Sequence, residues 1–226
     1  PNAFYGYATK GIYTSDAEAA QAGLKTKLFD GTLADFKGGD VRFVDLDNNK
    51  IIDEKDRQLI GNPTPKFYGG ITNRVTWNNW TLDALCTFVA GNSIYNYTRS
   101  QIESLAGVNN QSQAMNNRWR TDDHVTDVPK ATWGDPLQNG RFSDRWIEDG
   151  AYLRLRTVSL SYSWPVNKKV LKYVTAYLTG NNLLTFTNYL GYDPEFSATN
   201  SILGQGTDLL LEPIQKSCQL GIRIGL

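Results

Sequence analysis

The stretch that most constrains the fold is TVSLSYSWP, residues 157–165, in which polar and apolar side chains alternate without interruption. Its apolar positions are Val158, Leu160, Tyr162 and Trp164, and its polar positions are Thr157, Ser159, Ser161 and Ser163. Successive side chains of a β-strand point to opposite faces of the sheet, so this period of two predicts a strand with one apolar and one polar face. Pro165 has no N–H to give to a ladder and ends the pattern.

Four other segments show the same period, over residues 67–77, 80–90, 172–184 and 214–226. Asn78 and Asn79 separate the first two, and asparagine tolerates the positive φ that a tight hairpin turn requires. Just before residue 157 the apolar residues change from odd-numbered to even-numbered positions. Either the apolar band begins only near Thr157, or a β-bulge resets the alternation there.

Short turns alternate along the chain with long loops. The turns occupy residues 78–79 and 166–172, and the loops occupy 1–66, 91–149 and 185–213. Outer-membrane barrels have this layout, with turns in the periplasm and loops outside the cell. Aromatic residues flank both short turns and predict a girdle at the periplasmic interface: Trp77, Trp80, Trp164 and Tyr173. In this interpretation the apolar face contacts membrane lipid, and the polar face lines a wet lumen.

Five strands are too few to close a barrel, since the smallest barrels have about eight. Open edges in lipid would also leave backbone groups without hydrogen bonds. We therefore expect an all-β fold, in which about five strands belong to a large transmembrane antiparallel β-barrel with long extracellular loops. The expected parts are a loop region at 1–66, a hairpin at 67–90, a loop at 91–149, a hairpin at 150–184, a loop at 185–213 and a final strand at 214–226.

A soluble β-sandwich produces the same alternation, so a soluble calcium-binding, carbohydrate-binding sandwich remains the alternative. The formal net charge is 0, which does not favour a nucleic-acid partner. Two cysteines, Cys86 and Cys218, do not form a disulfide framework. The sequence has no nucleophile elbow and no phosphate-binding loop, so we expect a protein that is not an enzyme.

Residues 45–56, DLDNNKIIDEKD, have the spacing of a calcium-binding loop. The expected ligands are Asp45, Asp47, Asn49, Asp53 and Asp56 through side-chain oxygens and Ile51 through its carbonyl. Lys50 stands where such loops usually have glycine, and Asp56 is shorter than the usual glutamate. The other interpretation is a turn held by hydrogen bonds from its own Asp and Asn side chains. Ca²⁺ is therefore the one possible cofactor.

Three tryptophans lie in the long loop, and we consider them as a substrate-binding surface: Trp119, Trp133 and Trp146. Exposed aromatic rings can stack on sugars or contact a partner protein. The alternative is that they hold the loop together by packing inside it. Charged residues nearby, including Arg154 and Arg156, are expected to form ion pairs where the loop meets the barrel, while Asp193 and Glu195 are interpreted as part of a DPE turn.

Several longer motifs occur in a fixed order. They are FYGYATKGIYTSDAEA, GDVRFVDLDNNKIIDEKDRQLIGNPTPKFYGGITN, WRTDDHVTDVPKATWGDP, RFSDRWIEDGAYLRLRTVSLSYSWP and TGNNLLTFTNYLGYDPE. Together they resemble the C-terminal part of SusC/RagA-type TonB-dependent outer-membrane transporters, and the resemblance spans nearly the whole chain. Transporters of this type often end in an aromatic residue, whereas Leu226 ends this sequence.

The resemblance implies a role in nutrient uptake across the outer membrane of a Gram-negative, Bacteroidetes-like bacterium. Such transporters import glycans or peptides through a barrel of 22 strands filled by a plug. The implied partners are the rest of the barrel and the plug, a SusD-like surface lipoprotein, membrane lipid and the TonB complex. The segments through which such transporters contact TonB do not occur in this sequence. A surface adhesin built on a barrel would differ mainly in needing no coupling to TonB.

Overall fold

A computed structural model describes residues 3–166, 171–196 and 204–225 of the chain. The chain forms two compact units, which we describe separately. The sheet unit comprises residues 64–93, 149–196 and 211–226, and the loop unit comprises residues 1–63, 94–148 and 197–210. None of the helices in the described ranges is both long enough and apolar enough to cross a membrane.

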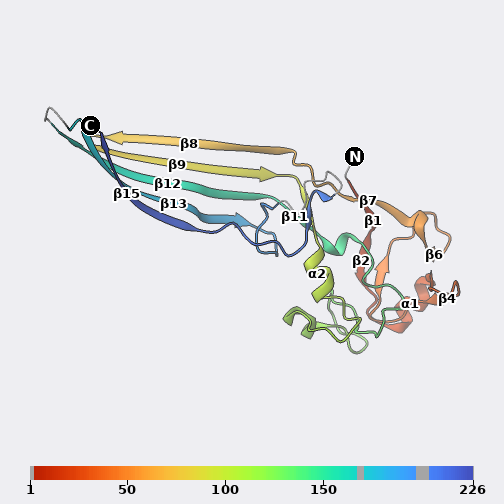
Figure 1. Cartoon of the computed structure of the whole chain (residues 1–226). Helices are drawn as coiled ribbons and strands as arrows, with labels where there is room; N and C mark the ends of the chain where they lie inside the picture. Colours follow the sequence, from red (N-terminus) through yellow and green to blue (C-terminus); the bar gives the residue numbers. More distant parts are fainter. Residues whose placement is uncertain (1–2, 167–170, 197–203, 226) are drawn as a thin grey trace. The chain divides into compact units, whose positions relative to one another are not determined.

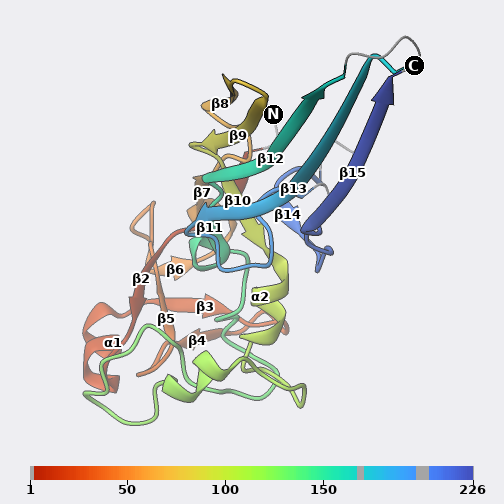
Figure 2. The ribbon, with the colours of Figure 1, turned by 90° about the vertical axis from the view of Figure 1, so that its left-hand side faces the viewer.

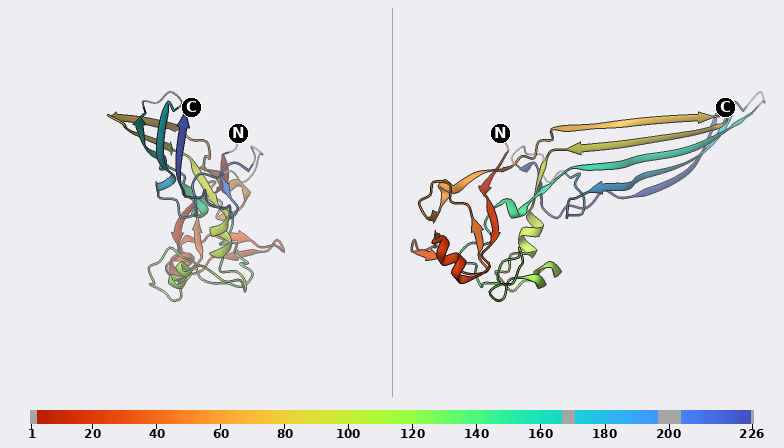
Figure 3. Two further views of the ribbon diagram at one scale, coloured as in Figure 1. Left: turned by 60° about the vertical axis from the view of Figure 1, so that its left-hand side comes forward. Right: turned by 180° about the vertical axis from the view of Figure 1, so that it is seen from behind.

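The sheet unit is a single antiparallel sheet of five long strands, in the order β8, β9, β12, β13 and β15 (Figure 1). Their bounds are Phe67–Trp77 for β8, Trp80–Ala90 for β9, Tyr152–Pro165 for β12, Tyr173–Thr187 for β13 and Ser217–Gly225 for β15. The sheet curves from β8 to β15 (Figure 2), and the long strands remain side by side when viewed from behind (Figure 3). The expected five-strand sheet is confirmed.

The turn between β8 and β9 forms where the two asparagines predict it. Trp77 pairs directly with Trp80, which leaves only Asn78 and Asn79 in the turn. Asn78 adopts the left-handed conformation, with φ of 52°. Asparagine occupies this region at lower cost than most residues, so the turn follows from the local sequence.

β12 contains a bulge, which settles the change of parity before residue 157. Its pairing with both β9 and β13 shifts register between Leu155 and Thr157. Leu155 then pairs with Cys86 and Leu160 pairs with Leu82, and both partners lie on one face of β9. The apolar face therefore continues past the bulge instead of starting at Thr157. β13 also extends to Thr187, three residues beyond the expected end of its hairpin.

Tyr173 does not belong to the apolar face, which corrects its place in the expected girdle. Tyr173 lies on the same face of β13 as Thr175 and Tyr177. Their neighbours on β12 are the polar Ser163 and Ser161. Tyr173 and Tyr177 lie over Gly225 and Gly221 of β15, where an added Cβ would overlap the rings. The tyrosine rings fill the space above the sheet that the glycines leave empty. Leu226 lies outside the described residues.

We expect Gly221→Ala to destabilise the barrel by about 1–2 kcal/mol, because the new methyl group overlaps the Tyr177 ring and displaces it. Unfolding of the complete protein in detergent would measure the loss. Gly70→Ala is the matched control, since its nearest contact is 3.4 Å away, at the Cys86 carbonyl. Combining Gly221→Ala with Tyr177→Ala should recover part of the loss. Equal effects of the two single substitutions would contradict this packing.

The loop unit is built from short elements around a small aromatic core. Its strands form four small sheets: β1 (Phe4–Tyr7) with β7 (Arg57–Gly61), β2 (Thr9–Ile12) with β5 (Val41–Phe43), β3 (Lys25–Lys27) between β4 (Leu33–Asp35) and β6 (Ile51–Ile52), and β10 (Ser93–Asn96) between β11 (Ile147–Asp149) and β14 (Thr207–Asp208). The helical elements are α1 (Asp16–Ala22), α2 (Tyr97–Ile102), η1 (Glu54–Asp56), η2 (Gln113–Asn117) and η3 (Asp144–Trp146). Tyr13 and Val41 are the most buried members of the core, and Phe43, Ile52 and Phe36 pack around them.

The helix α1 has seven residues, and the local sequence sets both of its ends. Ser15 caps its start by accepting a hydrogen bond from the Glu18 N–H. Gly23 ends it in the left-handed conformation, with φ of 65°, and donates its N–H to the Ala19 carbonyl. Glycine is the residue that most easily adopts this conformation. The chain after Gly23 can then form β3, whose pairing partners come from elsewhere in the sequence.

Candidate functional site

The two faces of the five-strand sheet differ in chemistry along its whole width. One row runs across the apolar face through Val75, Leu82, Leu160, Leu178 and Leu220, each paired with the next. All five side chains are exposed, and Leu220 is 81% exposed. Exposed apolar residues in such a continuous row indicate a surface that contacts another apolar medium.

The opposite face is polar at the same level of the sheet. Arg74 pairs with Asp83 through an ion pair, and Asp83 lies beside Ser159. The Ser159 and Thr179 hydroxyls lie 2.8 Å apart and form a hydrogen bond. Hydroxyl groups and a satisfied ion pair suit contact with water. The sheet therefore separates an apolar environment from an aqueous one.

Aromatic residues mark both ends of the apolar face, although the sequence indicates only one girdle. At the end with the short turns, the Trp80 and Tyr162 rings lie 4.8 Å apart, and the Tyr162 and Trp164 rings lie 4.9 Å apart. The other end carries Phe67, Phe88 and Phe186 on the same face, by their pairing. Trp80 and Phe88 are eight residues apart on β9. At roughly 3.3 Å per residue this is about 26 Å, close to the apolar band of about 25 Å in outer-membrane barrels.

A buried ionic cluster holds the 188–196 segment against the polar face. The Arg154 side chain is 2% exposed and forms ion pairs with Asp193 and with Glu195. Arg156 donates two hydrogen bonds to the Glu195 carboxylate, at 2.8 and 2.9 Å. Asp193 also accepts a hydrogen bond from the Ile214 N–H at 3.0 Å. The cluster thus connects β12 to two loop segments.

This cluster could be foreseen only in part from the sequence. Ion pairs of Arg154 and Arg156 are expected from their charge, but their partners come from the DPE turn 39 residues away. The other charged residues near η3 pair elsewhere, since Glu148 binds Arg99 and Asp144 binds Thr9. The only available signal was the coincidence of two arginines on one strand with two carboxylates in a later turn.

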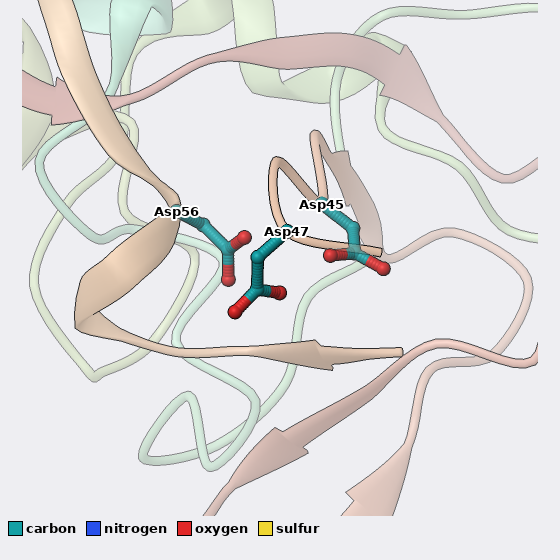
Figure 4. Close-up of side chains that lie close together, drawn as sticks. All are labelled: Asp45, Asp47 and Asp56. Atoms are coloured by element: carbon teal, nitrogen blue, oxygen red, sulfur yellow. The ribbon is translucent and has the colours of Figure 1, made fainter. Parts of the chain in front are cut away.

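Three of the proposed calcium ligands lie together in the loop unit. The carboxylates of Asp45, Asp47 and Asp56 each offer one oxygen, and these oxygens lie within 4.8 Å of one another. Figure 4 shows the three side chains directed towards the same region. Asp45 and Asp47 come from the turn that follows β5, and Asp56 comes from η1. Asp56 is 0% exposed. Asp45 is half-buried and Asp47 is exposed, so the three anionic groups lie together at the edge of the loop unit's surface.

The remaining proposed ligands have other roles. The Asn49 side-chain oxygen, Oδ1, accepts a hydrogen bond from the Ile51 N–H at 2.7 Å. Asp53 caps η1 by accepting a hydrogen bond from the Lys55 N–H. Ile51 forms β6 and pairs with Lys25 of β3. Lys50 adopts φ of 67°, the left-handed conformation for which calcium loops use glycine.

The residues present fit a Ca²⁺ ion in one further respect. Asp45 Oδ1 is buried and has no hydrogen-bond partner. A buried carboxylate oxygen without a partner is costly unless a cation or donor compensates it. Oxygen ligands are those that Ca²⁺ prefers. The hydrogen bonds within the loop also support the alternative interpretation of a turn held by its own side chains, with Asp47 accepting from Asn49.

The three loop tryptophans have different environments. Trp146 is 1% exposed and donates its Nε1–H to the Arg141 carbonyl, and the guanidinium groups of Arg99 and Arg145 lie over its ring. Burial and the neighbouring Arg99 lower the pKa of the Arg145 guanidinium. Trp119 packs against the core and donates its Nε1–H to the Thr14 carbonyl. Only Trp133, which is 75% exposed, presents its ring to a ligand.

Comparisons with known proteins agree with this geometry. No family model matches the chain. TonB-dependent receptor P3 of Formosa agariphila is 35% identical over 200 residues, which cover 87% of this chain and 19% of the receptor. TonB-dependent receptor P26 of the same organism is 28% identical over 193 residues, covering 82% and 19%.

Solved structures of RagAB show the same fold. A structure of the RagAB peptide transporter matches with a TM-score of 0.74 and 26% identity, over 99% of this chain and 22% of that chain. The RagAB peptide importer in the closed-closed state matches with a TM-score of 0.71 and 25% identity, over 99% and 23%. The chain spans about a fifth of the length of these relatives. In sequence and in fold, this chain belongs to the TonB-dependent receptors of the SusC/RagA type.

Proposed function

We propose that this chain forms part of the barrel wall of an outer-membrane, TonB-dependent importer of oligosaccharides or peptides. The observation that carries the proposal is the sheet with two faces, whose apolar band has the thickness of a bilayer and is bordered by aromatic residues. The relatives named above are receptors and an importer, not enzymes. β8 and β15 are the sheet's edges, so further strands would continue the wall on both sides.

The proposed location is the outer membrane of a Gram-negative, Bacteroidetes-like bacterium. The proposed partners are the remaining barrel and plug, a SusD-like surface lipoprotein, the TonB complex and membrane lipid. The alternative, a soluble calcium-binding and carbohydrate-binding sandwich, would bury the apolar face against a second sheet. Ile71 is 65% exposed and Ile222 is 69% exposed on this face, which favours the barrel.

Uptake by living cells tests the import function directly. Cells carrying the complete protein would be given fluorescent neutral oligosaccharides or peptides, with and without an active TonB complex. We expect uptake that requires both the protein and TonB, because a plugged barrel needs an energy source to open. Uptake that is independent of TonB would favour an open channel. Recovery of the complete protein from the soluble fraction would support the sandwich.

We also propose that the Asp45, Asp47 and Asp56 cluster binds Ca²⁺. A bound ion would neutralise the three carboxylates and connect β5 to η1 and β7. It would act as a structural link within the loop unit, with no part in chemistry on a substrate. The support is the convergence of the three side chains and the buried, unpaired Asp45 oxygen.

Chelation of Ca²⁺ is expected to lower the thermal stability of the loop unit. At a free Ca²⁺ concentration 100 times Kd, binding stabilises the folded state by about 2.7 kcal/mol. Asp47→Asn should remove this gain. It should not lower stability in the absence of Ca²⁺, because it also relieves repulsion among the three carboxylates. Asp30→Asn is a control, because Asp30 is an exposed acid that lies outside the cluster. Thermal unfolding that does not respond to Ca²⁺ would leave only the turn interpretation.

A further inference from the structure

A cavity of about 450 Å³ lies on the polar face of the sheet unit, where the ionic cluster ends. Its floor includes Arg154 and Asp193, and its walls come from β13 and the 213–216 segment. Its lining also includes the polar side chains of Thr185, Gln215 and Lys216. A concave site with a few convergent polar groups is the usual form of a small-ligand site.

The floor of the cavity is rigid, because its charged groups are already paired. Asp193 Oδ1 accepts hydrogen bonds from Arg154 and from the Glu195 N–H, and its Oδ2 accepts one from the Ile214 N–H. Arg154 also pairs with Glu195 at 3.2 Å. Asn182 fixes the wall by donating a hydrogen bond to the Gln215 carbonyl at 3.1 Å. These contacts hold the site in place before any ligand arrives.

Charge distinguishes the cavity from a neutral polar site. Its lining contains two cations, Arg154 and Lys216, and one carboxylate, Asp193. The Asp193 carboxylate is fully used by Arg154 and two main-chain N–H groups. Among the described residues, no carboxylate lies within ion-pair distance of the Lys216 ammonium group. The cavity therefore has one positive charge that its own residues leave uncompensated.

We propose that this cavity is a binding site for a carboxylate carried by the imported molecule, with Lys216 as its cationic partner. The Thr185 hydroxyl and the Gln215 amide are available to hydrogen-bond polar groups beside the carboxylate. Tyr192, which is 77% exposed, presents a ring at the edge. Both an acidic sugar and a peptide C-terminus carry such a carboxylate. The inference rests on the proposed import function, because the site lies on the face assigned to the lumen.

Direct binding to the complete transporter in detergent tests the site without any need for transport. One set of probes is trigalacturonate and its methyl ester, and the other is trialanine and trialanine amide. Within each set the two molecules differ mainly in the ligand's carboxylate charge. We expect at least one acid to bind, its neutral counterpart to bind roughly tenfold or more weakly, and the affinity to fall with salt. The set that shows this difference identifies the source of the carboxylate.

Lys216 variants assign the effect to this cavity. Lys216→Gln should weaken binding of the acid by roughly tenfold, and Lys216→Arg should retain most of it. Lys66→Gln is the control, since Lys66 is exposed in the same unit but lies outside the lining. Equal binding of the acid and neutral probes, or binding that Lys216→Gln leaves unchanged, would overturn the proposal. If TonB-dependent uptake is intact in either case, the import function stands and only this site is wrong.

Discussion

Arginine in place of Leu160 is expected to destabilise the assembled barrel by about 2–4 kcal/mol, the cost of such a residue at the lipid-facing midplane. Leu160 lies in the middle of the apolar row, between Leu82 and Leu178. A guanidinium at this position would lose its hydration within the bilayer. The fraction of folded protein in the outer membrane, measured by heat-dependent migration in gels, should fall sharply.

The neighbouring residue provides the matched control. Ser159 lies on the same strand but on the polar face, where its hydroxyl contacts Thr179. Ser159→Arg places the same charge on the wet side and should cost much less. Because the two positions are adjacent on β12 and lie on opposite faces, their comparison tests the assignment of faces directly. If the two substitutions had the same effect, the apolar face would not contact lipid.

Asp193→Ala is expected to cost about 3 kcal/mol or more, because it removes a partner from a buried arginine. Arg154 is 2% exposed and would keep only Glu195 as a carboxylate partner, which Arg156 also uses. The Ile214 N–H would lose its acceptor as well. Chemical unfolding of the complete protein in detergent would give the change in free energy, and limited proteolysis would show the release of residues 188–196.

A double substitution separates the buried charge from simple loss of packing. Arg154→Met combined with Asp193→Ala removes the arginine that Asp193→Ala leaves without its partner. Apolar replacement of a buried ion pair is often close to neutral, so the double variant should be more stable than Asp193→Ala alone. Arg74→Ala, which breaks the exposed pair with Asp83, should change stability by no more than about 1 kcal/mol. If Asp193→Ala were as mild as Arg74→Ala, the cluster would not hold the loop.

Much of the candidate site could not be derived from the sequence, because its contacts join distant segments. Asp193 and Arg154 are 39 positions apart, and no local pattern links them. The cavity beside them needs β13 and the 213–216 segment to come together. In the calcium-like loop, the spacing of six ligands was visible, but only the fold showed that Asn49 and Asp53 bond to their own backbone neighbours.

Alternation and turn residues are enough to predict the five strands, the two-residue turn and the difference between the two faces. These features are local, since a period of two assigns each side chain to a face whatever the partner strand is. Three features required the three-dimensional structure: the bulge between Leu155 and Thr157, the polar-face position of Tyr173 and the burial of Trp146. Each of these depends on register or packing against residues far along the chain, which alternation along one strand does not specify.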